Sequence, residues 1–104
     1  MIGQKPKVFI TRKLPKKIET RMMELFDTTL NESDQLLSED ELIKVFKHYQ
    51  IVVPSIADKI SSKILNEASE TLSLIANFGA GIDHIDLDEA KKKNIIVTNN
   101  PGLL

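Results

Sequence analysis

The 104-residue chain contains no cysteine, which excludes a disulfide framework, a thiol nucleophile and a cysteine-ligated zinc site. It also lacks an excess of either charge. Its 14 Lys and Arg against 15 Asp and Glu give a net charge of −1, which argues against a nucleic-acid-binding protein. No stretch approaches the roughly 20 apolar residues of a membrane-spanning helix, and the first residues lack the apolar segment of a signal peptide. These absences predict a cytoplasmic protein with no nucleic-acid partner and no membrane partner.

Low-complexity runs, internal repeats and linker-like segments are absent as well, so we expect one domain with one core. Five short runs rich in β-branched and apolar residues recur along the chain. Most of them are continuously apolar rather than alternating, which is typical of strands buried on both faces of a parallel sheet. The second run is the most polar and is expected at a sheet edge. The runs are residues 8–11, 28–30, 51–53, 72–76 and 95–98.

Helical patterns fill the gaps between these runs. Pro15 suits the first helical position, and Ser38 opens a capping box. A third helix is expected after Ser61, and a fourth from the cap Asp86 to a left-handed cap at Asn94. The alternation predicts an α/β fold: a flavodoxin-like, doubly wound, parallel five-stranded sheet of order 2-1-3-4-5 in three αβα layers.

Ligands of such sheets bind at the carboxyl ends of the strands, where the loops 11–15, 54–58 and 77–83 should gather. In the third loop, Gly79-Ala80-Gly81 allows a tight turn whose amides can form a nest for an anion. The same tripeptide also suits a plain tight turn after a buried strand. It is not the dinucleotide motif Gly-x-Gly-x-x-Gly, because the third glycine would have to replace His84.

Two other functions of flavodoxin-like sheets do not fit these loops. A phosphate-accepting receiver needs acidic residues after the first and third strands, where this chain has Thr11-Arg12-Lys13 and Pro54-Ser55. A flavin mononucleotide site needs a Ser/Thr/Gly-rich first loop, which is also missing. His48 is expected on the surface. His84 could approach a ligand beside the glycine loop, but the sequence offers it no evident acid–base partner.

Four parts of the sequence carry a resemblance to a known family: residues 7–12, residues 53–55 with 58–60, residues 75–86 and residues 96–102. The most specific one is Ile75-Ala76-Asn77-Phe78-Gly79-Ala80-Gly81-Ile82-Asp83-His84-Ile85-Asp86. In these stretches the chain resembles the D-isomer-specific 2-hydroxyacid dehydrogenases, especially their glyoxylate/hydroxypyruvate reductase branch. The resemblance extends over essentially the whole chain.

The resemblance implies that residues 1–104 are a partial substrate-binding (catalytic) domain, without the Rossmann NAD(P) domain of the family. The amides of Ala80 and Gly81, beside Gly79, would hold the carboxylate of a small 2-oxo or 2-hydroxy acid. Pro54 and Ser55 would line the same cleft. The full-length enzyme would be a homodimer that uses NAD or NADP to transfer hydride to or from carbon 2 of the acid.

The catalytic His, its Glu partner, the substrate-binding Arg and the nucleotide-binding glycines of the family have no counterpart in this chain. We therefore expect no catalytic, cofactor-binding or metal-binding residue here, no bound cofactor and no activity from these residues alone. The family usually has Asn where His84 stands and Thr where Asn100 stands. An alternative function is that of a non-catalytic, flavodoxin-like anion-binding or interaction module.

Overall fold

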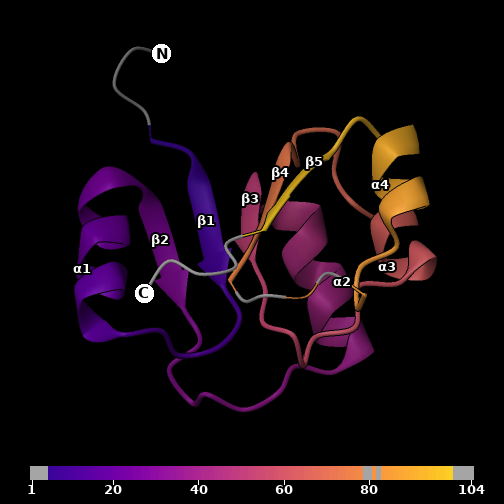
Figure 1. Cartoon of the computed structure of the whole chain (residues 1–104). Helices are drawn as coiled ribbons and strands as arrows, with labels where there is room; N and C mark the ends of the chain where they lie inside the picture. Colours follow the sequence, from indigo (N-terminus) through magenta and orange to yellow (C-terminus); the bar gives the residue numbers. More distant parts are fainter. Residues whose placement is uncertain (1–4, 79–80, 82, 100–104) are drawn as a thin grey trace.

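The computed structural model describes residues 5–78, 81 and 83–99. Helices and strands alternate strictly along this part of the chain (Figure 1). The strands are β1 (Lys7–Ile10), β2 (Asp27–Leu30), β3 (Ile51–Val53), β4 (Leu74–Asn77) and β5 (Ile96–Asn99). The helices are α1 (Lys16–Leu25), α2 (Glu39–His48), α3 (Ser62–Asn66) and α4 (Leu87–Lys92).

The five strands form one parallel sheet in the order β2-β1-β3-β4-β5, which confirms the predicted fold class. The threonine-containing β2 lies at an edge, as its polarity predicts. The strand order reverses between β1 and β3, where Val8 is in register with Ile51. All carboxyl ends therefore meet at one edge of the sheet, which is the lower edge in Figure 1.

Helices cover both faces of the sheet, as the predicted three layers require. Side chains alternate between the faces along each strand, so that Val8 and Ile10 belong to one apolar cluster and Phe9 to the other. The first cluster packs against α1 and the second against α2, α3 and α4 (Figure 1). One face thus has three helices and the other has one among the described residues.

Most of the predicted helix ends are confirmed. The Ser38 hydroxyl accepts the Glu41 N–H at 3.1 Å, while the Glu41 carboxylate accepts the Ser38 N–H at 2.8 Å. Ser61 and Asp86 cap α3 and α4, and Asn94 has the left-handed φ of 60°. The first helix differs by one residue, because Pro15 has an extended ψ of 141° and precedes it as the cap.

Two strands also begin later than the apolar runs that predict them. Leu72 is buried, but its N–H donates to the Ser69 carbonyl in a turn, so β4 starts only at Leu74. Ile95 is buried as well, but its N–H donates to the Ala90 carbonyl and completes the cap of α4. In both places a turn or cap uses an apolar residue that the sequence pattern assigns to a strand.

Candidate functional site

A buried carboxyl group joins the loops that follow β1 and β3. The Thr11 hydroxyl donates to Asp58 Oδ2. The backbone N–H and the hydroxyl of Ser55 donate to the same oxygen, at 2.9 and 3.2 Å. Thr11 and Asp58 are both at most 1% exposed, so this link lies beneath the surface. It fixes Ser55 next to the point where the strand order reverses.

The loop after β3 is also tied to the segment around the glycine loop. The Phe78 N–H donates to the Pro54 carbonyl at 3.2 Å. Farther along, the Ile60 N–H donates to the His84 carbonyl at 2.8 Å and the Ile60 carbonyl accepts the Asp86 N–H at 2.9 Å. These bonds fix the backbone on both sides of residues 79–83.

Asn77, the last residue of β4, connects three groups at this edge. Its Nδ2 donates to the Gly81 carbonyl at 2.7 Å and to Asn99 Oδ1 at 3.1 Å. Its Oδ1 lies 2.8 Å from Nε2 of His84. Asn77 and Asn99 are register partners on β4 and β5. These two strands are therefore joined by a side-chain hydrogen bond at this position as well as by their backbones. Asn77 itself is 1% exposed.

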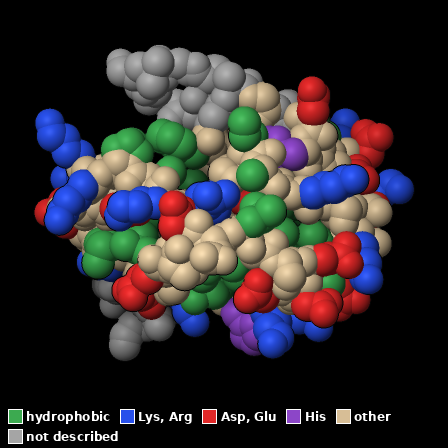
Figure 2. Space-filling view, turned by 90° about the horizontal axis from the view of Figure 1, so that it is seen from below, with side chains coloured by type: hydrophobic (Ala, Val, Ile, Leu, Met, Phe, Trp, Pro, Cys, Tyr) green, Lys and Arg blue, Asp and Glu red, His purple; other side chains and the backbone are tan. Residues whose placement is uncertain are grey.

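The charges at this end of the molecule are largely balanced. Arg12 Nε lies 3.1 Å from Asp34 Oδ1, and the Lys13 N–H donates to the same oxygen at 2.7 Å. The Lys13 amide, followed by Arg12, holds the pKa of Asp34 below its usual value of 3.8. Figure 2, which views the molecule from this end, shows Lys, Arg, Asp and Glu side chains interspersed among uncharged atoms. The site therefore relies on local hydrogen-bond donors rather than on a broad positive field.

His84 is half-buried, and burial lowers its pKa below the usual 6.5. The carboxylates of Asp58 and Asp83 act in the opposite direction and raise this pKa. The net shift is downward, so the ring is mainly neutral at neutral pH.

The structure describes three of the five predicted substrate-binding residues. Gly79 and Ala80 lie outside the described residues. Gly81 is exposed, Ser55 is half-buried and Pro54 is buried. The Ser55 hydroxyl donates its proton to Asp58. Ser55 therefore helps to fix the shape of the loop, and its hydroxyl proton is not free for a ligand. The hydrogen bonds described above bring the Pro54–Ser55 loop and the loop containing Gly81 together.

The sequence patterns alone predict no role for four residues that carry the hydrogen bonds of this edge: Thr11, Asp58, Asn77 and Asn99. A signal for two of them is present in the sequence. Thr11 and Asn77 are polar residues at the carboxyl end of an apolar strand, where a buried side chain must find a partner. Asp58 has no such signal, because its burial depends on the path of the loop, and Asn99 has none because it is exposed.

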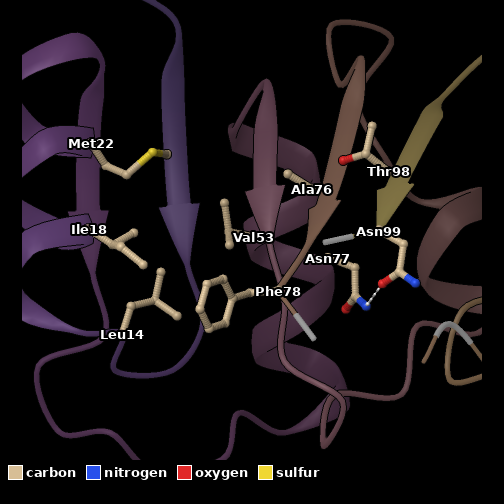
Figure 3. Close-up of a pocket in the computed structure, with 9 residues that line it drawn as sticks. All are labelled: Leu14, Ile18, Met22, Val53, Ala76, Asn77, Phe78, Thr98 and Asn99. Carbon is tan, nitrogen blue, oxygen red and sulfur yellow. Dashed lines mark hydrogen bonds between the residues drawn. The ribbon is translucent and has the colours of Figure 1, made fainter. Parts of the chain in front are cut away.

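An apolar cavity of about 420 Å³ lies on the α1 side of the same edge (Figure 3). Figure 3 shows Leu14, Ile18 and Met22 on one side and Ala76 and Thr98 on the other. Phe78 lies between them, and the Asn77–Asn99 pair forms part of the wall. A cavity lined mainly by hydrocarbon suits apolar groups better than a carboxylate.

The described residues do not fit a dinucleotide site. The helix after the glycine loop, α4, is capped by Asp86 and carries Asp88 and Glu89 in its first turn. Three carboxylates at a helix amino end would repel a pyrophosphate, which usually binds there. Within the described ranges, no group of three or more His, Asp or Glu side chains could hold a metal ion, and no helix is long and apolar enough to cross a membrane.

Comparisons with known proteins point to one family. The family model described as the D-isomer specific 2-hydroxyacid dehydrogenase catalytic domain matches residues 8–104. The chain is 34% identical over 101 residues to the glyoxylate reductase of Thermofilum pendens and 32% identical over 100 residues to that of Pyrococcus furiosus. Each alignment covers 96% of this chain and 30% of the relative.

Solved structures contain the same fold. A protein from Pyrococcus horikoshii superposes with a TM-score of 0.83 at 30% identity, over 95% of this chain and 28% of that one. A protein from Thermus thermophilus superposes with a TM-score of 0.79 at 29% identity, over 92% of this chain and 30% of that one. The chain thus spans about 30% of the length of the curated relatives that it matches.

Proposed function

Because this chain belongs to the D-isomer-specific 2-hydroxyacid dehydrogenase family, we propose that it forms the substrate-binding part of an NAD(P)-dependent reductase of the glyoxylate/hydroxypyruvate type. The observation that carries the proposal is the joining of three loops at the carboxyl edge of the sheet. Thr11, Ser55 and Asn77 each make a hydrogen bond that holds one of these loops in place. Among the described residues, Asn77 makes the bond that ties Gly81 of the glycine loop to the end of β4.

The ligand of this loop is the carboxylate of a small 2-oxo or 2-hydroxy acid. The amides of Ala80 and Gly81, beside Gly79, bind it as a nest of N–H donors, which needs no side-chain rearrangement. Pro54 and Ser55 form the neighbouring wall. Gly81 supports this assignment, because it is exposed and, apart from its chain neighbours, no atom of the described residues lies within 4 Å of a Cβ built on it.

NAD or NADP is held by a part of the enzyme other than the described residues. The acidic amino end of α4 supports this division of roles. When bound, the nicotinamide supplies or accepts the hydride, while this chain orients the acid. The catalytic acid–base pair and the arginine expected from the family also belong to the other part, so this chain alone is inactive.

A binding and activity experiment on the purified 104-residue chain tests the proposal. Glyoxylate and hydroxypyruvate should shift amide resonances of Gly81 and its neighbours in ¹⁵N-labelled protein. The same chain should leave NADH unconsumed when either acid is added. Absence of any shift would rule out the carboxylate site, and NADH consumption by this chain would rule out the division of roles. Binding without a catalytic partner domain encoded in the same reading frame would favour the non-catalytic module.

The full-length enzyme is also proposed to be a cytoplasmic homodimer. The absence of cysteine supports a reducing compartment. Sedimentation of the full-length protein at twice the mass of one chain would support the homodimer, and a monomer would exclude it.

A further inference from the structure

The three hydrogen bonds of Asn77 determine which way its amide points. Nδ2 lies near two oxygen atoms, the Gly81 carbonyl at 2.7 Å and Asn99 Oδ1 at 3.1 Å. Because the Gly81 carbonyl can only accept, the NH₂ group must face it. Asn77 Oδ1 then faces His84 Nε2 at 2.8 Å, and that nitrogen must carry the proton. The tautomer of His84 is thus set by a backbone carbonyl on the glycine loop.

This arrangement holds the Gly81 carbonyl against the end of β4. Gly81 is exposed, whereas its partner Asn77 is 1% exposed, so the bond anchors the loop to the core. A carbonyl oxygen turned toward a bound anion would present the negative end of its dipole to it and weaken binding. The bond to Asn77 prevents that orientation.

We propose that Asn77 and His84 are positioning residues for the substrate carboxylate: Asn77 keeps the Gly81 carbonyl away from the anion, and His84 holds the Asn77 amide in the orientation that does so. This inference rests on the proposed function. Both residues act through the loop and not by contact with the substrate. Asn99 completes the arrangement, because its Oδ1 takes the second proton of the Asn77 amide.

The same arrangement gives the site a charge that depends on pH. The neutral ring and the cation of His84 both carry a proton on Nε2, so the bond to Asn77 persists as the ring titrates. The charged groups acting on the ring are Asp58, on the loop after β3, and Asp83, its near neighbour. Protonation adds one positive charge beside the anion site. Glyoxylate, which stays ionised in this range, should therefore bind more tightly as the pH falls through the pKa of His84.

Two substitutions of His84 distinguish a role in positioning the Asn77 amide from a purely structural role. His84→Gln is long enough to keep an N–H donor near the place of Nε2 but cannot titrate, and His84→Ala removes the donor. His48→Gln is the matched control, because His48 is the other of the two histidines and lies exposed on α2, bonded to the Lys44 carbonyl. Glyoxylate affinity is measured by ¹⁵N NMR titration of each purified 104-residue protein between about pH 5 and 8, a range that spans the usual pKa of histidine.

The wild type and His48→Gln should bind glyoxylate roughly three- to tenfold more tightly at the acidic end, the scale expected for one added charge at a half-exposed site. His84→Gln should match the wild type at the alkaline end within about threefold and show a flat pH profile, since it keeps the hydrogen bond alone. His84→Ala should bind about tenfold more weakly than His84→Gln, the scale of one lost hydrogen bond. Imidazole ¹⁵N shifts of wild-type His84 should show the Nε2–H tautomer at the alkaline end.

The results distinguish the inference from the function on which it rests. If the wild type binds no glyoxylate at any pH, the proposed function fails and the inference fails with it. If the wild type binds but His84→Ala binds equally well, only the positioning role is wrong. A pH profile that persists in His84→Gln, or an Nδ1–H tautomer in the wild type, also overturns the inference. Should His84→Ala not fold, the profile of His84→Gln and the tautomer still decide the question.

Discussion

Gly81 has no steric need to be glycine within the described part of the structure. A Cβ built on it meets no atom within 4 Å apart from its chain neighbours. We therefore expect Gly81→Ala to change the free energy of unfolding by less than about 1 kcal/mol, and to stabilise the fold if anything, because alanine restricts the unfolded chain. The added methyl group should instead obstruct the carboxylate and weaken glyoxylate binding at least about tenfold, or about 1.4 kcal/mol.

Urea unfolding and NMR titration of the same Gly81→Ala protein measure the two effects side by side. The affinity for glyoxylate should fall, while the urea midpoint of unfolding should stay near that of the wild type. Unchanged affinity would show that the ligand does not approach this residue. A large loss of stability would show that the glycine is required by the fold.

Thr11 is the buried donor that links the end of β1 to Asp58. Asp58 Oδ1 has no hydrogen-bond partner among the described residues, so Oδ2 accepts the available donors. Thr11→Val keeps the shape but removes the hydroxyl, and should lower the free energy of unfolding by about 1–3 kcal/mol. Thr98→Val, at an exposed position on β5, is the control and should change it by less than about 0.5 kcal/mol. Equal urea midpoints for the two variants would contradict the prediction.

At the scale of elements, Asp34 ties the loop between β2 and α2 to the segment after β1. The Lys13 amide and then Arg12 lower the pKa of Asp34 from 3.8, so the folded state favours the carboxylate. Its contribution to stability is therefore present above the unfolded pKa and is lost as the pH falls through the lower folded pKa. Asp34→Asn should be less stable than the wild type at about pH 5, and the difference should shrink by about pH 3.

Urea midpoints of the wild type and Asp34→Asn, measured at both pH values, test whether the difference in stability shrinks as the pH falls. Asp27→Asn serves as the control, because Asp27 is an exposed carboxylate for which the structure gives no ion pair among the described residues. A difference that grows as the pH falls would contradict the assignment.

The sequence predicts the elements and their order because burial on both faces leaves a strong local pattern. The caps at Ser38, Ser61 and Asp86 are equally local, since each one needs only a side chain and an N–H three residues later. Long-range contacts are different. The Thr11–Asp58 and Asn77–Asn99 pairs join residues 47 and 22 positions apart, and no local pattern specifies them.

Apolar residues next to a strand show the same limit. Leu72 and Ile95 are buried like strand residues, but a turn and a helix cap use their N–H groups. An apolar side chain indicates that a residue is buried in the core, but it does not indicate whether that residue belongs to a strand, a turn or a helix cap. The sequence therefore predicts which loops meet at the carboxyl edge of the sheet, while the hydrogen bonds between these loops depend on the fold.

At the scale of the whole molecule, the two faces of the sheet are covered unequally. α2, α3 and α4 cover one face, whereas α1 covers only part of the other among the described residues (Figure 1). On the second face, Ile96 of β5 is 64% exposed, and Ala76 and Thr98 line the apolar cavity. Parallel strands are normally buried on both sides. Among the described residues, Ile96 and this cavity thus leave apolar surface exposed to water.

We expect the isolated 104-residue chain to self-associate through this surface, because pairing two copies removes the exposed apolar side chains from water. Ile96→Thr keeps a β-branched residue in the strand but makes it polar, and should reduce the association. Ile56→Thr is a closely matched control, because Ile56 is the same residue type with the same exposed fraction of 64% on a loop. Light scattering should show an apparent mass that rises with concentration for the wild type and Ile56→Thr, and stays near 11.7 kDa for Ile96→Thr. A wild-type mass that does not change with concentration, or equal slopes for the two variants, would mean that this face does not drive association.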